Sequence, residues 1–254
     1  MIELTYDEEF AILTLQRPAA LNALSFELIG RIEELIREAD RSDARALIVT
    51  GEGEKSFCAG ADIKELQNRG LAAQREGAEL GQAVFAQFDR LSMPSVALVN
   101  GFAFGGGCEL ALACTLRLAL PNAKFGLPEV KLGLIPGYGG TQRLPRLVGQ
   151  GRALELIMTG RTVGADEALA IGLVNRIVQG PGLEAAKAYA REFTGYSLLA
   201  LQFAREAVQR AADVSLHDGL RIEADLSTLA YRTRDAQEGM HAFVEKRKAA
   251  FKDE

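Results

Sequence analysis

Short apolar runs alternate with amphipathic helical stretches over about the first 195 residues, and this alternation constrains the fold more than any other feature. The runs have the length of buried strands, and they lie at residues 10–15, 44–51, 94–101, 116–120 and 172–178. Stretches with helical spacing of apolar residues separate them, at residues 28–39, 74–91, 106–114, 141–158 and 183–194. Strands that alternate with helices in this way predict an α/β fold with much parallel pairing.

The strand pattern stops at about Gly195. Beyond it the apolar residues, among them Leu198 and Phe203, recur with helical spacing only. A chain of 254 residues can bury one large core and carry a small appended domain. We therefore predict a core domain over residues 1–195 and an α-helical domain over residues 196–254.

Two glutamates lie inside apolar, glycine-rich runs. Glu109 lies in GFAFGGGCELALAC, and Glu129 lies in KFGLPEVKLGLIPGYGG. Neither run contains an arginine, and the only cations near in sequence, Lys124 and Lys131, neighbour Glu129. A buried carboxylate without a partner has a raised pKa, and proteins keep such groups where a proton must move at neutral pH. The pair predicts an acid and a base that face one substrate.

Two glycine-rich elements accompany the glutamates. In SFCAGADIKEL the Ala-Gly-Ala turn lets the backbone approach a ligand, and Asp62 is placed to cap a following helix. Gly105-Gly106-Gly107 directly precedes the helical stretch of Glu109, and its N–H groups suit an oxyanion. Each element alone favours a plain tight turn. Together with the two glutamates they indicate enolate chemistry beside a carbonyl group.

Charge and composition disfavour several classes of function. The net charge is −5 and no basic stripe is present, which disfavours binding to nucleic acids or anionic membranes. The N-terminal residues MIELTYDEEF lack the pattern of a signal peptide, and no apolar run approaches the ~20 residues of a membrane span. We therefore expect a cytoplasmic protein. Residues 51–56 have Glu54 where a phosphate-binding loop needs glycine, and residues 101–107 do not fit the dinucleotide pattern.

Cysteine and histidine chemistry is also disfavoured. Cys58, Cys108 and Cys114 form no C-x-x-C pair, so they indicate apolar packing groups in a reducing compartment and no zinc site. His217 and His241 lie in the charged C-terminal region, where we expect them on the surface. No G-x-S-x-G element is present, so a catalytic triad is not expected.

Four segments of the sequence together resemble one known family. They are FCAGADIKEL, NGFAFGGGCELALAC, KFGLPEVKLGLIPGYGGTQRLPRLVG and EGMHAFVEKRKAAFKDE. With the turn at Leu15–Pro18, they make nearly the whole chain similar to the enoyl-CoA hydratase (crotonase) family. The resemblance implies the crotonase (ClpP-like) spiral of repeated ββα units, with two roughly perpendicular sheets and a C-terminal α-helical trimerisation domain.

The resemblance also implies roles for residues of the site. Ala61 and Gly106 match the positions whose backbone N–H groups form the oxyanion hole. Glu109 and Glu129 match the two carboxylates that hydratases possess, and we assign Glu109 as the base and Glu129 as the acid. Gly137 matches a position whose backbone helps to hold the attacking water.

Further positions match the family's coenzyme A contacts. Ala59, Ala61 and Lys64 are expected along the coenzyme A moiety, and Phe243 and Lys246 are expected to reach the coenzyme A of a neighbouring subunit. Solvated surface is the alternative for both lysines, and core packing is the alternative for Phe243. The family forms homotrimers or hexamers that are dimers of trimers. Coenzyme A is part of the substrate, and no metal or redox cofactor is implied.

The implied reaction is the reversible syn addition of water to a trans-2-enoyl-CoA, which gives a 3-hydroxyacyl-CoA, as in fatty-acid β-oxidation. The alternatives are an enoyl-CoA isomerase of the same fold, a non-catalytic acyl-CoA-binding protein and an RNA-binding member. Tyr138 departs from the small residue common at its position, and residues 67–83 carry no family signature. Acyl-chain length is therefore the property that the sequence defines least.

Overall fold

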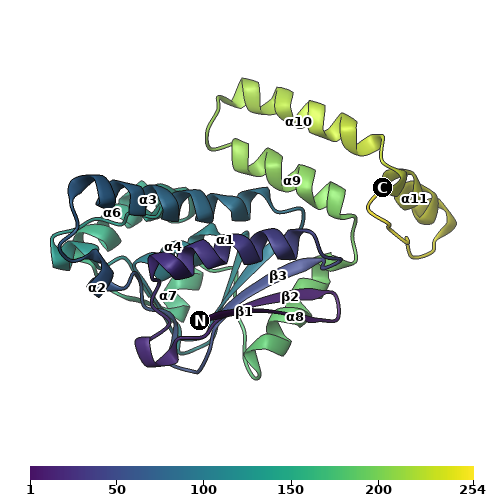
Figure 1. The fold of residues 1–254 in the computed structure, drawn as a ribbon. Coiled ribbons are helices and arrows are strands. Elements are labelled where there is room, and N and C mark those ends of the chain that lie inside the picture. Colours follow the sequence, from purple (N-terminus) through teal and green to yellow (C-terminus); the bar gives the residue numbers. More distant parts are fainter.

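A computed structural model describes residues 1–254, and Figure 1 shows a layered α/β core from which the last helices extend. The core contains a six-stranded sheet and a four-stranded sheet. The larger sheet has the order β1 (Ile2–Asp7), β2 (Phe10–Leu15), β3 (Ala46–Gly51), β5 (Ser95–Val99), β7 (Leu116–Ala119) and β10 (Arg176–Ile177). The smaller sheet has the order β4 (Ser56–Cys58), β6 (Phe102–Phe104), β8 (Lys124–Gly126) and β9 (Val163–Gly164).

Helices connect the strands and form the C-terminal region. Those of the core are α1 (Phe26–Asp40), α2 (Ile63–Leu66), α3 (Leu71–Phe85), α4 (Gly106–Ala113), α5 (Gly140–Val148), α6 (Gln150–Thr159), α7 (Ala165–Ala170) and α8 (Gly182–Thr194). The last three are α9 (Leu198–Arg210), α10 (Leu216–Tyr231) and α11 (Arg234–Glu245). Short 3-10 turns are η1 (Pro18–Ala20), η2 (Ala86–Arg90) and η3 (Glu129–Leu132).

The central strands β2, β3, β5 and β7 of the larger sheet are buried on both faces, whereas the edge strands β1 and β10 are partly exposed. Only β1 pairs antiparallel, with β2, and the other neighbours are all parallel. Along β2, Leu13 and its alternate neighbours face the main core with α1, whereas Phe10 and Ile12 face a smaller cluster with α8. Parallel strands covered by helices on both faces read as continuous apolar runs, which is why the sequence pattern located them.

Two sequence predictions of elements were wrong. Residues 172–178 were expected as a strand, but only Arg176–Ile177 pairs, because the N–H groups of Leu173 and Val174 bond back to the carbonyl of Ala168 at the end of α7. Residues 141–158 were expected as one helix, but α5 and α6 are separated at Gly149, whose φ is +82°. A left-handed φ of this kind ends a helix at glycine.

The smaller sheet positions the glycine-rich elements. Its strands β4, β6 and β8 are parallel and only three residues long, so no periodicity revealed them. Each leads into a turn that contains predicted site residues: β4 into Ala59–Ala61, β6 into Gly105–Gly106 and β8 into Leu127–Glu129. Because the carboxyl ends of parallel strands lie at the same edge of a sheet, the three turns converge there.

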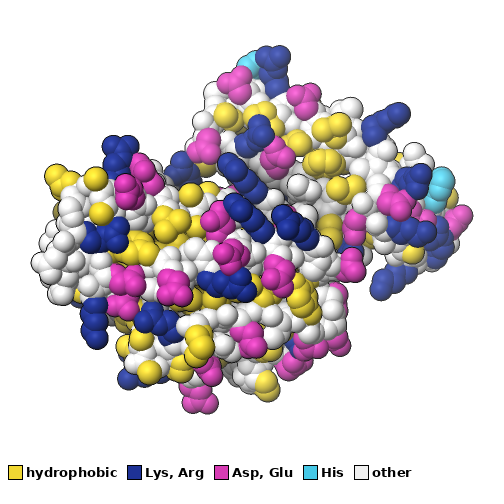
Figure 2. All heavy atoms as spheres, viewed as in Figure 1, with side chains coloured by type: hydrophobic (Ala, Val, Ile, Leu, Met, Phe, Trp, Pro, Cys, Tyr) yellow, Lys and Arg dark blue, Asp and Glu magenta, His cyan; other side chains and the backbone are white.

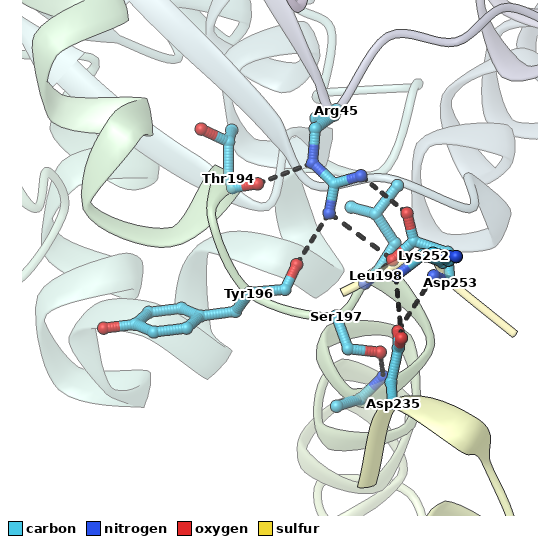
Figure 3. A network of polar contacts seen from close by, with 9 residues as sticks. Arg45, Thr194, Tyr196, Ser197, Leu198, Asp235, Lys252 and Asp253 are labelled. Atoms are coloured by element: carbon cyan, nitrogen blue, oxygen red, sulfur yellow. Dashed lines mark hydrogen bonds and ion pairs between the residues drawn. The ribbon is translucent and has the colours of Figure 1, made fainter. Parts of the chain in front are cut away.

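A polar network joins the C-terminal region to the core (Figure 3). The Arg45 guanidinium donates to the carbonyl oxygens of Thr194 at 2.6 Å and Tyr196 at 2.8 Å, and to the Asp253 carboxylate at 2.6 Å. Asp253 also accepts from the Leu198 N–H at 2.6 Å. The buried carboxylate of Asp235 accepts from the N–H groups of residues 252 and 253. The network holds the end of the chain where α9 leaves the core.

Helices α9 to α11 extend from the core in Figure 1 and bury little of their own surface. Hydrophobic side chains are exposed among charged ones over this region in Figure 2. Examples are Val208, Leu216, Leu220, Leu229, Tyr231 and Phe243. No helix of the chain has both the length and the apolar composition needed to cross a membrane. The division at Gly195 remains a proposal about independent folding units.

Candidate active site

The three converging turns line a cavity of about 540 Å³. Its walls are mostly apolar and come from the turns, from the first part of α3 and from the loop that joins η3 to α5. Glu109 and Glu129 both line it, together with Ala61 and Gly106. A concave apolar cavity with a few convergent polar groups is the usual form of a small-molecule site.

Backbone groups of two turns lie close together in the cavity. On the first turn, Leu24 donates its N–H to the Gly60 carbonyl and accepts from the Asp62 N–H, so this bridge holds the backbone on either side of Ala61 and leaves the Ala61 N–H pointing away from Leu24. On the second turn, Gly106 is the first residue of α4, so its N–H has no acceptor within the helix. The Ala61 nitrogen lies 3.4 Å from where a Cβ on Gly106 would stand, so the two backbones are in close contact.

Glu109 is held in the cavity by backbone amides. It lies in the first turn of α4 and is 1% exposed. Its Oε1 accepts hydrogen bonds from the N–H of Tyr138 at 2.8 Å and from the N–H of Gly140 at 2.7 Å. Burial raises the pKa of Glu109 to about 7, against the opposing effect of these two amides, and the nearby Glu129 raises it further. At neutral pH the carboxyl group is therefore ready to exchange a proton.

Glu129 begins η3 after β8 and reaches the same cavity from another turn. Its Oε2 is buried and has no hydrogen-bond partner, and burial raises the pKa of this carboxyl group. Its Oε1 lies 2.8 Å from where a Cβ on Gly105 would stand, so that position has no room for a side chain. Neither Lys124 nor Lys131 forms an ion pair with Glu129. The sequence prediction of an unpaired carboxylate therefore agrees with this geometry.

The turn between η3 and α5 contributes backbone groups to the cavity, and the role expected for Gly137 stays a prediction. Gly137 lines the cavity, but its carbonyl oxygen accepts from the Gln82 side chain at 2.8 Å. The amides that bind Glu109 belong to Tyr138 and Gly140, and sequence reasoning assigned no role to these two N–H groups. Gly139 between them has a φ of +112°, a conformation that turns both flanking N–H groups toward one oxygen. The glycine spacing of the turn was the available signal.

The expected coenzyme A contacts are not all brought together within one chain. Ala59 and Ala61 line the cavity, whereas Lys64 is exposed on α2 and does not line it. Phe243 is exposed on α11, and Lys246 ends that helix with a φ of +56°. Figure 1 shows α11 at the opposite side of the view from α2, so these two residues are remote from the cavity of their own chain.

The sequence analysis noted Tyr138 and residues 67–83 in connection with the acyl chain, but it did not identify Phe26 as part of the apolar wall of the cavity. Phe26, Gly77, Ala78 and Tyr138 contribute to it. Most of α3 lies in the segment that carried no family signature, and Gly77 and Gly81 both lie on its buried face. Two glycines four residues apart in a helical stretch were the signal, because helix interiors disfavour glycine unless something packs closely there.

The cysteines do not contribute a nucleophile. Cys58, Cys108 and Cys114 are all buried and unpaired. Burial raises the pKa of each thiol to about 12, so none is a thiolate at neutral pH. The carboxyl groups that line the cavity are those of its two glutamates.

Comparisons with known proteins agree with this geometry. The model of the family described as enoyl-CoA hydratase/isomerase matches residues 6–254. The chain belongs to the enoyl-CoA hydratase/isomerase family. The crotonase fold is also confirmed, because the crystal structure of an enoyl-CoA hydratase from Bacillus anthracis superposes with a TM-score of 0.94 at 38% identity. That comparison covers 100% of this chain and 99% of the other.

Two relatives within the hydratase/isomerase family are similar over nearly their whole length. A crotonyl-CoA hydratase from Syntrophomonas wolfei is 45% identical over 252 residues, which are 98% of this chain and 97% of that protein. A short-chain-enoyl-CoA hydratase from Clostridium acetobutylicum is 43% identical over 240 residues, which are 94% of this chain and 92% of that protein.

Proposed function

We propose that this enzyme catalyses the reversible syn addition of water to short trans-2-enoyl-CoA thioesters, giving 3-hydroxyacyl-CoA. The observation that carries the proposal is the buried carboxyl group of Glu109 and the half-buried one of Glu129, whose Oε2 is buried, in one apolar cavity beside the backbone N–H groups of Ala61 and Gly106. Enoyl-CoA hydratase activity is supported further by the family match and by relatives that bear hydratase names.

The backbone donors supply the electrostatic part of the reaction. Addition of water to the double bond places negative charge on the thioester oxygen as an enolate. N–H groups of Ala61 and Gly106, held in close contact by their turns, stabilise that charge without rearrangement. Donors of this kind are worth about 3–4 kcal/mol each in other enzymes.

The glutamates divide the proton transfers. Glu109 accepts two backbone hydrogen bonds, which favour its ionised form, so it serves as the base that takes a proton from water attacking C3. Glu129 has an unbonded buried oxygen, which favours its protonated form, so it delivers a proton to C2. Because two carboxyl groups near each other titrate as a pair, their apparent pKa values belong to the pair.

The preference for short acyl chains is supported by the names of two relatives, a crotonyl-CoA hydratase and a short-chain-enoyl-CoA hydratase. The test is hydration of a trans-2-enoyl-CoA series from four to sixteen carbons. The rate is measured from the disappearance of the conjugated double bond. Product analysis separates hydration from the isomerase alternative, since isomerisation moves the double bond and adds no water. Absence of hydration at every length would refute the proposal. Activity on such substrates would place the enzyme in β-oxidation or a similar acyl-CoA pathway.

We further propose that the enzyme assembles as a homotrimer or a dimer of trimers through α9 to α11. Exposed apolar residues on these helices support an interface, since a lone chain leaves them in water. In such an assembly Phe243 and Lys246 would contact the coenzyme A of a neighbour, and Lys64 that of its own chain. Sedimentation at micromolar concentration tests the assembly.

Two further parts of the proposal concern partners and compartment. Three unpaired, buried cysteines are compatible with a reducing compartment, and we propose the cytoplasm. The net charge of −5 disfavours the RNA-binding alternative. A gel-shift titration at several salt concentrations tests it, and turnover of any enoyl-CoA excludes a purely non-catalytic role.

A further inference from the structure

Two aromatic rings occupy space that two glycines of α3 leave free. A Cβ placed on Gly77 would lie 2.7 Å from Cζ of Phe26, and one placed on Gly81 would lie 2.6 Å from Cε1 of Tyr138. Both glycines are buried, and they are four residues apart, so they face the same side of the helix. The two rings therefore pack directly on the α3 backbone at the cavity wall.

The Tyr138 ring is enclosed on three sides. Besides Gly81, it contacts Gly106, where a Cβ would lie 3.1 Å from Cδ2, and it meets the Phe85 ring edge-on with centroids 5.8 Å apart. Its own backbone N–H is engaged with Glu109 at 2.8 Å. The ring is thus fixed between α3 and the start of α4, and the residue is only 7% exposed.

The position of the ring relative to the reacting groups determines its effect. In the proposed mechanism Gly106 supplies an oxyanion donor and Glu109 faces C3. The Tyr138 ring contacts Gly106, and the Tyr138 backbone N–H binds Glu109. Carbons of an acyl group beyond C3 therefore meet the ring within a few bonds. Burial raises the pKa of the Tyr138 hydroxyl to about 12, so the ring remains a neutral, largely apolar wall at working pH.

We propose that the Tyr138 side chain closes the inner end of the acyl cavity and sets the upper limit of acyl-chain length. The inference rests on the proposed hydratase function and makes its substrate class specific: linear acyl groups of about four to six carbons. Gly81 is required for this position of the Tyr138 ring, since any side chain at residue 81 would displace the ring. A longer acyl chain could also leave the cavity past the exposed residues Ile135 and Leu132. In that case the wild type would hydrate long and short substrates equally well.

The test compares three variants with the wild type over the same enoyl-CoA series, using kcat/KM at each length. The wild type should lose at least about tenfold in kcat/KM between six and ten carbons, since misfit of a methylene group in a pocket costs about 10–200-fold. Tyr138→Ala should raise the ratio of ten-carbon to four-carbon kcat/KM at least about tenfold. Tyr138→Phe, the matched control, keeps the ring and should retain the wild-type ratio within about twofold.

Folding of the variants is checked by circular dichroism and thermal unfolding. Tyr138→Leu fills part of the space and should give an intermediate ratio, so it carries the test if Tyr138→Ala does not fold. A folded Tyr138→Ala or Tyr138→Leu enzyme with the wild-type ratio would overturn the inference. So would a wild type that hydrates sixteen-carbon and four-carbon substrates equally well, although the hydratase function would then stand. A wild type that hydrates no length would refute the proposed function itself.

Discussion

Glu109 Oε1 lies 2.8 Å from the backbone nitrogen of Tyr138, which is 29 residues further along the chain. The carboxyl group is thus oriented by main-chain amides and by no cationic side chain. Burial raises the pKa of Glu109, and the two amide donors lower it. The amides offset burial only in part, so the pKa is about 7. Tyr138 consequently serves two purposes, since its backbone orients Glu109 while its ring forms the cavity wall.

Replacement of either glutamate tests the acid–base pair. Glu109→Gln and Glu129→Gln should each lower kcat for hydration by about 10²–10⁴-fold, the usual worth of general acid–base catalysis. Substrate binding should change less, because the amide is nearly isosteric with the carboxyl group. Stopped-flow hydration and product-binding measurements check both statements.

The pattern of the two variants distinguishes the candidate reactions. Near-normal turnover in one variant would remove that glutamate from the mechanism. If Glu129→Gln alone is impaired, the isomerase alternative gains support. The control is Glu79→Gln. Glu79 forms an exposed ion pair with Arg75 on the outer side of α3, and the variant should turn over normally.

Burial of Glu109 makes stability depend on pH. The pKa in the folded state is about 7, against an ordinary value of 4.5, so the folded state binds more protons than the unfolded state between these pH values. The free energy of unfolding should therefore fall as pH rises from about 4.5 to about 7, by on the order of 3 kcal/mol from this group. Below this window the contribution is fully present, and above it the contribution is lost.

The Glu109→Gln variant isolates that effect, because glutamine keeps the neutral state at every pH. Urea unfolding from pH 5 to pH 8 should show the variant gaining stability relative to the wild type as pH rises. A difference that is constant with pH would contradict the raised pKa. Because Glu129 titrates together with Glu109, the same comparison is repeated in a Glu129→Gln background, where Glu109 titrates without that partner.

Removal of a single N–H tests the oxyanion hole. Gly106→Pro should reduce transition-state stabilisation by about 3–4 kcal/mol, seen in kcat/KM for hydration. Proline is tolerated at the first position of a helix, but its Cβ would lie 3.1 Å from Cδ2 of Tyr138, so thermal unfolding and coenzyme A binding are measured alongside. Gln150→Pro, at the first position of α6, is the matched control and should leave hydration intact. Full-rate hydration by a folded Gly106→Pro enzyme would show that the glycine is only structural.

The Arg45 network should fix the C-terminal helices. Arg45→Ala removes the partner of Asp253 and the donors to two carbonyl oxygens, and we expect a loss of about 1–3 kcal/mol in unfolding free energy. Amide hydrogen exchange should speed up across α9 to α11. Arg234→Ala, which removes an exposed ion pair with Glu254, is the control and should change little. Equal exchange in both variants would show that packing alone holds these helices.

The proposed contacts of Phe243 and Lys246 with the coenzyme A of a neighbouring subunit can be tested by enzyme kinetics. Phe243→Ala and Lys246→Ala should raise KM for enoyl-CoA while kcat is largely kept, because both residues lie far from the acid–base pair. Truncation after Gly195 should abolish both assembly and activity. Sedimentation of the wild type accompanies the kinetics. A fully active monomer at micromolar concentration would contradict the trimer and the shared role of these residues.

The sequence by itself determined the elements whose signal is local. Continuous apolar runs predicted the central strands, and the helical spacing at residues 28–39 predicted α1, which Ser25 caps by accepting from the Leu28 N–H at 3.1 Å. The motifs around Glu109 and Glu129 also sufficed to place the chain in its family. These features are readable because burial of a strand or capping of a helix depends on neighbouring residues in the chain.

Only the tertiary structure decided how the site is assembled. The strands β4, β6 and β8 are too short for a periodic signal, yet their parallel pairing brings Ala61, Gly106 and Glu129 to one edge. The two amides that bind Glu109 lie 29 and 31 positions from it, and Tyr138 packs against Gly81, which lies 57 positions away. Such contacts depend on the packing of whole elements against each other, and no local pattern of residues encodes them.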